Sequence, residues 1–166
     1  LIKLVEDGQL DLAIASADTL PAPLESAPFW EEDYVLAVGA EHKLGKRKSV
    51  ALAELAEEAF ILFPESYKLR DVTLSACRAA GFRPKVALDG GAMQSALQFV
   101  AAGLGVALVP QLALTDTANI HALRITDQSL RRTLGLVWRK GHALSPAAGA
   151  LRPIAADHEP HAQAAG

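Results

Sequence analysis

The chain has 166 residues, of which 51% are hydrophobic, and its 16 basic and 19 acidic side chains give a formal net charge of −3. This balance offers no general attraction for a polyanion such as DNA, and the single cysteine, Cys77, excludes a disulfide framework and cysteine-rich zinc sites. No apolar run approaches the ~18 residues of a membrane span, and no leader peptide is recognisable. We therefore expect a cytoplasmic protein without membrane contact, whose core serves one domain or two small lobes.

The chain begins in what the sequence predicts to be the end of a helix. Leu1, Leu4 and Val5 fall on one helix face, and Gly8 supplies the residue type that commonly ends a helix. A helix end without a helix start suggests that the chain is part of a longer protein.

Two strands are predicted next. Residues 10–15 form an apolar run that leads to Ser16, and a second apolar run covers residues 34–38. Between them, the three prolines of segment 18–28 favour an extended loop. The basic stretch 43–48 is typical of a solvated loop.

Helices and strands alternate in the middle of the chain. Ser49 is expected to cap a helix through Ala56, and residues 60–63 form a third strand. A helix with one apolar face runs from Leu69 until Gly81 stops it, and a strand follows at residues 85–88. This alternation favours a mostly parallel sheet with right-handed crossovers.

Segment 89–110 is the most informative part of the sequence. Residues 93–100 follow the spacing of one helix face, and residues 106–109 read as a strand covered on both faces. Gly90 and Gly91 leave the start of this helix bare, so that a ligand can approach the unpaired N–H groups of its first turn. A carboxylate or another small anion suits that position, although a glycine pair can also serve a tight turn alone.

The remaining elements are a brief helix after Pro110, strands at residues 120–125 and 133–139, and a last helix that opens at Ser145. Pro153 is expected to shorten or kink that helix, and the tail from His158 to Gly166 reads as a frayed end.

Motifs of catalysis and metal binding are missing from the sequence. The five histidines show no metal-ligand spacing, and the chain has no Gly-x-Ser-x-Gly elbow, Walker loop or dinucleotide fingerprint. We therefore predict no metal, no cofactor and no enzymatic activity. Because catalytic triads assemble in space, an enzyme stays an open alternative.

Several stretches together resemble the effector-binding domain of LysR-type bacterial transcriptional regulators. They are residues 4–14, 28–44, 77–84 and 100–110, which occur in the family's order and cover nearly the whole chain. The resemblance implies an α/β fold like that of type 2 periplasmic binding proteins, with two lobes joined by two crossover strands. Lobe I would take residues 1–38 and 120–166, lacking its first strand, and lobe II residues 39–119.

The resemblance also implies a function. The domain would bind a small anionic metabolite, the co-inducer, in the cleft between the lobes, and would contact DNA only through a helix-turn-helix domain that this chain lacks. The alternatives are a free-standing solute-binding protein and an enzyme on the same two-lobed scaffold. The expected effector-binding residues are Ser16, Glu65, Ser66, Tyr67, Arg70, Gly90, Gly91, Ala92 and Met93. For Arg70, a simple ion pair with Asp71 or Glu65 is the alternative reading.

Family members form homodimers or tetramers through their effector domains. The resemblance pairs the helix that ends at Gly8 with a partner's helix 69–80, and the residues expected at this interface are Leu1, Leu4, Leu74 and Cys77. The alternative is that these side chains face their own sheet. Cys77 itself is expected to act as a small apolar residue rather than as a redox group.

Overall fold

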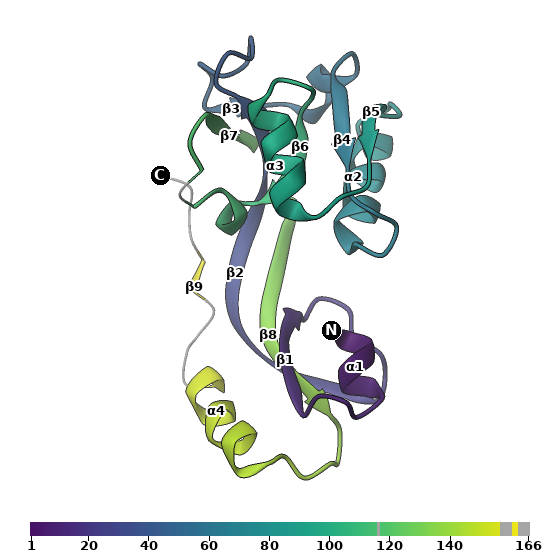
Figure 1. Cartoon of the computed structure of the whole chain (residues 1–166), viewed down its shortest axis with the longest axis vertical. Helices are drawn as coiled ribbons and strands as arrows, with labels where there is room; N and C mark the ends of the chain where they lie inside the picture. Colours follow the sequence, from purple (N-terminus) through teal and green to yellow (C-terminus); the bar gives the residue numbers. More distant parts are fainter. Residues whose placement is uncertain (116, 157–160, 163–166) are drawn as a thin grey trace. The chain divides into compact units, whose positions relative to one another are not determined.

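The protein is described by a computed structural model that covers residues 1–115, 117–156 and 161–162 (Figure 1). Its helices are α1 (Ile2–Glu6), α2 (Lys68–Ala79), α3 (Met93–Ala101) and α4 (Pro146–Ala156), with 3₁₀ helices η1 (Leu52–Leu55) and η2 (Gln111–Leu114). Its strands are β1 (Leu12–Ser16), β2 (Leu24–Gly39), β3 (Ser49–Val50), β4 (Ala59–Leu62), β5 (Lys85–Asp89), β6 (Ala107–Pro110), β7 (Ile120–Ile125), β8 (Arg131–Arg139) and β9 (His161–Ala162). The predicted α/β class is confirmed.

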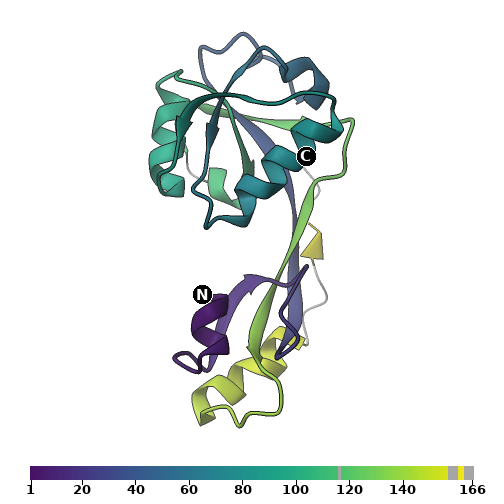
Figure 2. The ribbon, with the colours of Figure 1, turned by 90° about the vertical axis from the view of Figure 1, so that its right-hand side faces the viewer.

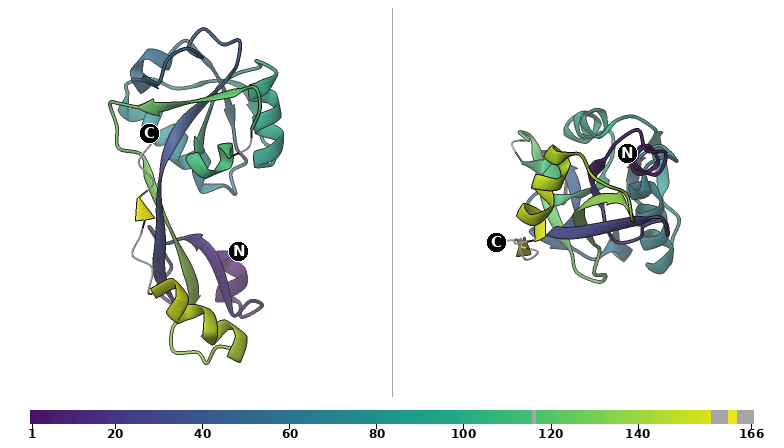
Figure 3. Two further views of the ribbon diagram at one scale, coloured as in Figure 1. Left: turned by 90° about the vertical axis from the view of Figure 1, so that its left-hand side faces the viewer. Right: turned by 90° about the horizontal axis from the view of Figure 1, so that it is seen from below.

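The chain folds into two compact units. The first contains the described residues of 1–32 and 131–162, and the second those of 33–130. Strands β2 and β8 are neighbours in the sheet and run side by side (Figure 3). The predicted lobe boundaries stay a prediction; the compact units differ from them because residues 35–38 of β2 and most of β7 pack with the second unit.

The first unit is built on an antiparallel ladder between β1 and β8. The register runs from the pair Leu12 and Trp138 to the pair Ser16 and Leu134. Helix α1 buries Val5 completely against a cluster that includes Val137. The sequence predicts each of these three elements near its observed position, because each one is a short run of closely spaced apolar residues.

Strand β2 is much longer than the sequence indicated. It begins at Leu24, so the prediction of a loop over residues 18–28 is wrong for its second half, and Pro28 lies inside the strand. Proline fixes φ at a value that extended backbone tolerates and removes only one hydrogen-bond donor, so it does not end a strand by itself.

The second unit contains a mixed sheet. Strand β2 is antiparallel to both β6 and β7, while β3 pairs parallel with β7 and β4 with β5. A parallel bridge between Phe60 and Val106 links β4 to β6, giving the order β3-β7-β2-β6-β4-β5. The prediction of a mostly parallel sheet is therefore wrong for β2 and for the first unit, because apolar runs look alike in parallel and antiparallel strands.

This topology gathers the functional loops of the second unit at one edge. All its strands except β2 run in one direction. The turns after β4, β5, β6 and β7 therefore emerge at the edge of the sheet where β2 passes into the second unit, near Asp33. Helices α2 and α3 pack on the sheet (Figure 2) and enclose a core whose fully buried members include Phe60, Leu97 and Val100. Ligands of open α/β sheets bind at this carboxyl edge.

Three further predictions need correction. Ser49 does not cap a helix, because Ser49 and Val50 form β3 and the short helix η1 starts only after Ala51. Helix α4 continues past Pro153 to Ala156, so Pro153 does not shorten it. Of the tail expected to fray, His161 and Ala162 pair with β2 as β9, and residues 158–160 and 163–166 lie outside the described residues.

Candidate functional site

The turns that follow β4 and β5 lie together in the second unit. The backbone N–H of Gly90 donates to the carbonyl of Leu62 at 3.0 Å. Arg70, in the first turn of α2, joins both turns: its Nη1 donates to the carbonyl of Phe63 at 2.9 Å and to Oδ1 of Asp89 at 2.5 Å, and its Nη2 donates to Oδ2 of Asp89 at 2.9 Å. The structure thus brings the predicted segments 65–70 and 90–93 to one place.

The charge of Arg70 is already matched within the protein. The hydrogen bonds from its guanidinium hold the pKa of the Asp89 carboxyl below the usual range, and Asp89 in turn raises the pKa of Arg70. Asp71 and Glu65, the alternatives read from the sequence, do not form the hydrogen-bonded ion pair with Arg70; they add only weaker electrostatic attraction, which also raises its pKa. A ligand carboxylate at Arg70 would have to compete with a bidentate internal ion pair, so the geometry favours a role for Arg70 in holding the two turns in place.

The glycine pair is open to approach. Gly90 and Gly91 have φ values of +104° and +100°, a region that residues with a Cβ rarely adopt. A Cβ at Gly90 would meet no atom within 4 Å, and one at Gly91 would meet only the Cβ of Ser95, at 3.7 Å. Helix α3 follows with Ala92 as its N-cap and no side-chain cap hydrogen bond. The first-turn N–H groups therefore face a turn that carries no bulky side chain.

An aromatic pair flanks these turns. Tyr67 is 39% exposed, and its ring stacks on the buried ring of Phe63 with centroids 5.8 Å apart and planes at 21°. Glu65, Ser66 and Ala92 are exposed, whereas Met93 is half-buried against the core. The exposed face of Tyr67 adds apolar contact area beside a polar backbone turn.

Ser16 lies in the first unit, at the end of β1. Its hydroxyl donates to Oδ2 of Asp18 at 2.7 Å, and Oδ1 of Asp18 accepts from the backbone N–H of Thr133 at 2.9 Å. Ser16 is thus part of a local network that joins β1 to β8. Its membership of one site with the turns of the second unit stays a prediction.

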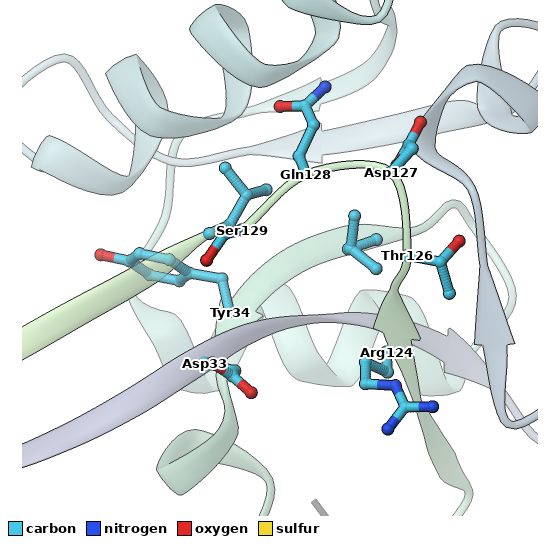
Figure 4. A pocket seen from close by; sticks show the side chains of 9 residues that line it. Asp33, Tyr34, Arg124, Thr126, Asp127, Gln128 and Ser129 are labelled. Atoms are coloured by element: carbon cyan, nitrogen blue, oxygen red, sulfur yellow. The ribbon is translucent and has the colours of Figure 1, made fainter. Parts of the chain in front are cut away.

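Sequence reasoning missed a cavity in the second unit. It has a volume of about 360 Å³ and lies between residues 33 and 34 of β2 and the turn after β7 (Figure 4). Its lining residues are Asp33, Tyr34, Arg124, Ile125, Thr126, Asp127, Gln128, Ser129 and Leu130. The two segments are about ninety positions apart in the chain, so no local motif could have joined them. The local signal is the polar run 126–129, which has neither helix nor strand periodicity.

The predicted interface residues separate into two groups. Leu1 and Leu4 are exposed on α1, at 71% and 38%. Cys77 is fully buried and Leu74 packs partly against the same core of the second unit, so Cys77 is not available at a surface and its assignment is corrected. Burial also raises the pKa of the Cys77 thiol to about 11, which keeps it protonated and unreactive near neutral pH.

Neither a metal site nor a membrane span is found in the described part of the chain. No three histidine, cysteine, aspartate or glutamate side chains within it are placed to hold a metal ion. None of its helices has the length and apolar character needed to cross a bilayer.

Comparison with known proteins gives a consistent result. Residues 1–159 match the family described as LysR substrate binding domain. The chain is 31% identical over 158 residues to the uncharacterized HTH-type transcriptional regulator YybE of Bacillus subtilis, covering 95% of this chain and 54% of that protein. It is 32% identical to the transcriptional dual regulator GltC of the same species, covering 89% and 50%. The chain thus spans about half the length of the curated relatives it matches.

Solved structures show the same fold. The effector binding domain of QuiR in complex with shikimate has a TM-score of 0.84 and 24% identity, covering 94% of this chain and 75% of that chain. The regulatory domain of Synechocystis CcmR in complex with 2-PG has a TM-score of 0.86 and 19% identity, covering 97% and 79%. These similarities confirm the predicted two-lobed fold of the periplasmic-binding-protein type.

Proposed function

The chain belongs to the LysR substrate-binding domain family, and from that membership we propose that it senses a small anionic metabolite for a LysR-type transcriptional regulator. DNA contact would come from a helix-turn-helix domain outside this chain, which fits the net charge of −3. The binding energy would derive from hydrogen bonds and the helix dipole, without a metal or cofactor.

The open turn at Gly90 and Gly91 is the observation that carries this proposal. Both residues hold positive φ values, which exclude most side chains and keep the start of α3 accessible. The first N–H groups of a helix carry its positive end, so an anionic group of a ligand is stabilised there. Because the Arg70 and Asp89 charges cancel one another, the helix end supplies the uncompensated positive potential of this site.

The remaining predicted residues have supporting roles in this proposal. Arg70 fixes the relative position of the two turns through Phe63 and Asp89. Tyr67 offers an exposed aromatic face to the carbon skeleton of the ligand. The shikimate and 2-PG complexes of two structural neighbours support a small molecule as the ligand class.

Regulation would follow from a difference in affinity. A ligand shifts an equilibrium between two arrangements of a protein only by as much as it binds one of them better. The metabolite would favour one arrangement of the effector domains. That arrangement would change how the attached DNA-binding domains are positioned on DNA. The matched family and the named relatives give no support to the alternatives of a free-standing solute-binding protein or an enzyme.

We also propose that the domain forms a homodimer through α1. Leu1 and Leu4 expose apolar side chains on this helix, and Leu74 on α2 would contribute from the partner. Sedimentation equilibrium of the chain and of its Leu4→Asp variant tests this contact. A dimer that Leu4→Asp dissociates supports it, and a dimer that the variant leaves intact contradicts it.

A thermal-shift screen of the 166-residue chain against small carboxylates, phosphate esters, aromatic acids and sugars tests the ligand site. A bound ligand raises the free energy of unfolding by mass action, ~2.7 kcal/mol at a hundredfold excess over Kd. We expect saturable stabilisation by an anion that Gly91→Asp abolishes, because the new carboxylate would repel it.

The matched control is Gly81→Asp at the other end of α2. Gly81 also has a positive φ, +89°, and a Cβ there would meet nothing within 4 Å, so the substitution introduces the same strain and charge away from the site. If both variants lose the stabilisation by the anion equally, or if both keep it, the anion does not bind at the glycine pair and the proposal is contradicted.

A further inference from the structure

The backbone of β1 has one side that no other described strand uses. Strand β1 stands at the end of the strand order and, among the described strands, pairs only with β8. The backbone N–H of Ala17 donates to the carbonyl of Thr133 at 2.8 Å, in line with the register of this ladder. Every second residue counted back from Ala17 therefore directs its backbone N–H and C=O groups toward β8. The residues that direct these groups toward the open side are Leu12, Ile14 and Ser16.

Strand β1 lacks the features that protect an exposed strand edge. Natural edge strands are kept from pairing by lysine, proline, bulges or a very short length. The edge strands of the second unit follow this rule: β3 has two residues, and β5 begins with Lys85 and ends with Asp89, each of which forms an ion pair. Strand β1 consists of five uncharged residues, and its ladder with β8 is regular. The open side of β1 is thus suited to pairing with a further strand.

An exposed apolar side chain accompanies this open side. Helix α1 covers one face of β1 and β8, where Val5 packs with Ala13 and Val137. The side chain of Ile14 belongs to the opposite face and is 57% exposed, although Leu136, its partner on β8, is buried. A neighbouring strand that covered Ile14 would remove apolar surface from water. Both the backbone and the side chain of Ile14 therefore favour a partner on this side of β1.

We propose that β1 pairs antiparallel with β1 of a second copy of the chain. The two-fold axis passes beside Ile14, so Ile14 lies opposite the partner's Ile14, and Leu12 lies opposite the partner's Ser16. Each of these pairs exchanges two backbone hydrogen bonds, which satisfies the outward groups of both strands. The two Ile14 side chains cover one another, and the sheets of the two copies join along β1.

The charges beside β1 favour this occupant and this register. Asp11 and Asp18 lie just outside the two ends of the strand. In the proposed register Asp11 lies opposite the partner's Ala17, and Asp18 lies opposite the partner's Leu10, so no like charges face each other. A slip by one residue would bring Asp11 opposite the partner's Asp18 and turn the two Ile14 side chains to opposite faces. The other edge strands of a second copy fit less well, because β3 is too short and β5 carries charges at both ends.

Sedimentation equilibrium of the 166-residue chain over a range of concentrations tests the pairing. Ile14→Lys places two ammonium groups opposite one another at the axis, so we expect the dissociation constant of the dimer to rise about tenfold or more. Val86→Lys is the matched control, because Val86 is 49% exposed on the edge strand β5, and we expect it to leave the dissociation constant unchanged. A wild-type chain that stays monomeric, a dimer that Ile14→Lys leaves intact, or an equal effect of both variants overturns the proposal.

Amide hydrogen exchange separates this contact from the homodimer proposed through α1. The N–H groups of Leu12 and Ile14 should exchange slowly only at concentrations at which the chain dimerises, whereas that of Ala15, which faces β8, should be slow throughout. Leu4→Asp on α1 should leave this protection unchanged, and Ile14→Lys should remove it.

Three results of the exchange experiment overturn the pairing of β1. Protection that never depends on concentration, because it is absent, leaves the edge unpaired. Slow exchange of Ile14 at every concentration means that another part of the same chain covers the edge. Protection that Leu4→Asp removes and Ile14→Lys keeps assigns the dimer to α1 alone, so the two interfaces fail separately.

Discussion

Oε1 of Glu32 on β2 accepts hydrogen bonds from Nε of Arg132 on β8 at 2.8 Å and from its Nη2 at 2.6 Å. Glu32 is only 1% exposed, whereas Arg132 retains 25% side-chain exposure. The pair joins the two strands at the last residues of the first unit, next to the position where each strand meets the second unit. A buried carboxylate at this place depends on its partner to offset the loss of solvation.

Replacing Arg132 with Met should therefore be strongly destabilising. The substitution leaves the Glu32 charge buried without this partner, and we expect a loss of about 3 kcal/mol in the free energy of unfolding, measured by urea denaturation. The neighbouring pair of Glu31 and Arg131 is exposed and 3.7 Å apart, so Glu31→Gln should change stability by less than about 1 kcal/mol. Similar losses in the two variants would show that burial of Glu32 does not govern the effect.

The ion pair of Arg70 and Asp89 should make stability depend on pH in the acid range. The pKa of Asp89 lies below its ordinary value of 3.8 in the folded chain, so the unfolded chain binds more protons between the two values. The contribution of the pair is complete above the ordinary value and is lost as pH falls through the lowered one. We expect the difference in thermal stability between the wild type and Asp89→Asn to be constant near neutral pH and to shrink on acidification.

Asp11→Asn is the control for this comparison, because Asp11 is exposed in the first unit and lies outside the pair. Its stability curve should follow that of the wild type through the acid range. An Asp89→Asn difference that stayed constant down to the lowest pH would contradict the assigned pKa direction.

Asp127 should stabilise η1 from a distance in sequence. Its carboxylate accepts the N–H groups of Leu52 and Ala53, which a helix start leaves without internal partners. Asp127→Ala should cost about 1 kcal/mol in urea denaturation, while Asp127→Asn, which keeps a side-chain oxygen, should cost clearly less. Equal losses in both variants would indicate that the charge, rather than the cap, is responsible.

The contrast between Ser49 and Asp127 shows what a sequence can predict here. Helix α3 followed from its apolar spacing, and the glycine turn followed from Gly90 and Gly91, because both signals are local. The cap of η1 comes instead from a residue more than seventy positions away. The partner of Arg70 and the cavity beside Tyr34 were missed for the same reason, since each depends on strand order rather than on neighbouring residues.

Glu54 should titrate far below an ordinary glutamate. Its carboxylate accepts two hydrogen bonds from Arg47, at 2.7 Å and 2.9 Å, and one from the backbone N–H of Ala51 at 2.9 Å. The Arg47 bonds are the largest cause that lowers the pKa of Glu54 from 4.5 to about 2. NMR titration of the side-chain carboxyl carbon should give a midpoint near that value, and Arg47→Gln should raise it. An unchanged midpoint in Arg47→Gln would contradict the assigned cause.

The same substitution, glycine to alanine, should have opposite effects at two positions. Gly91 has a φ of +100°, so a Cβ there strains the backbone, and we expect Gly91→Ala to lower the free energy of unfolding by about 1–2 kcal/mol. Gly149 lies within α4, where a Cβ would meet nothing within 4 Å, so Gly149→Ala should raise it by up to ~1 kcal/mol. Urea denaturation of both variants measures the two signs. A neutral Gly91→Ala would mean that the turn relaxes to a conformation open to any residue, and the accessible start of α3 would then not depend on the glycine pair.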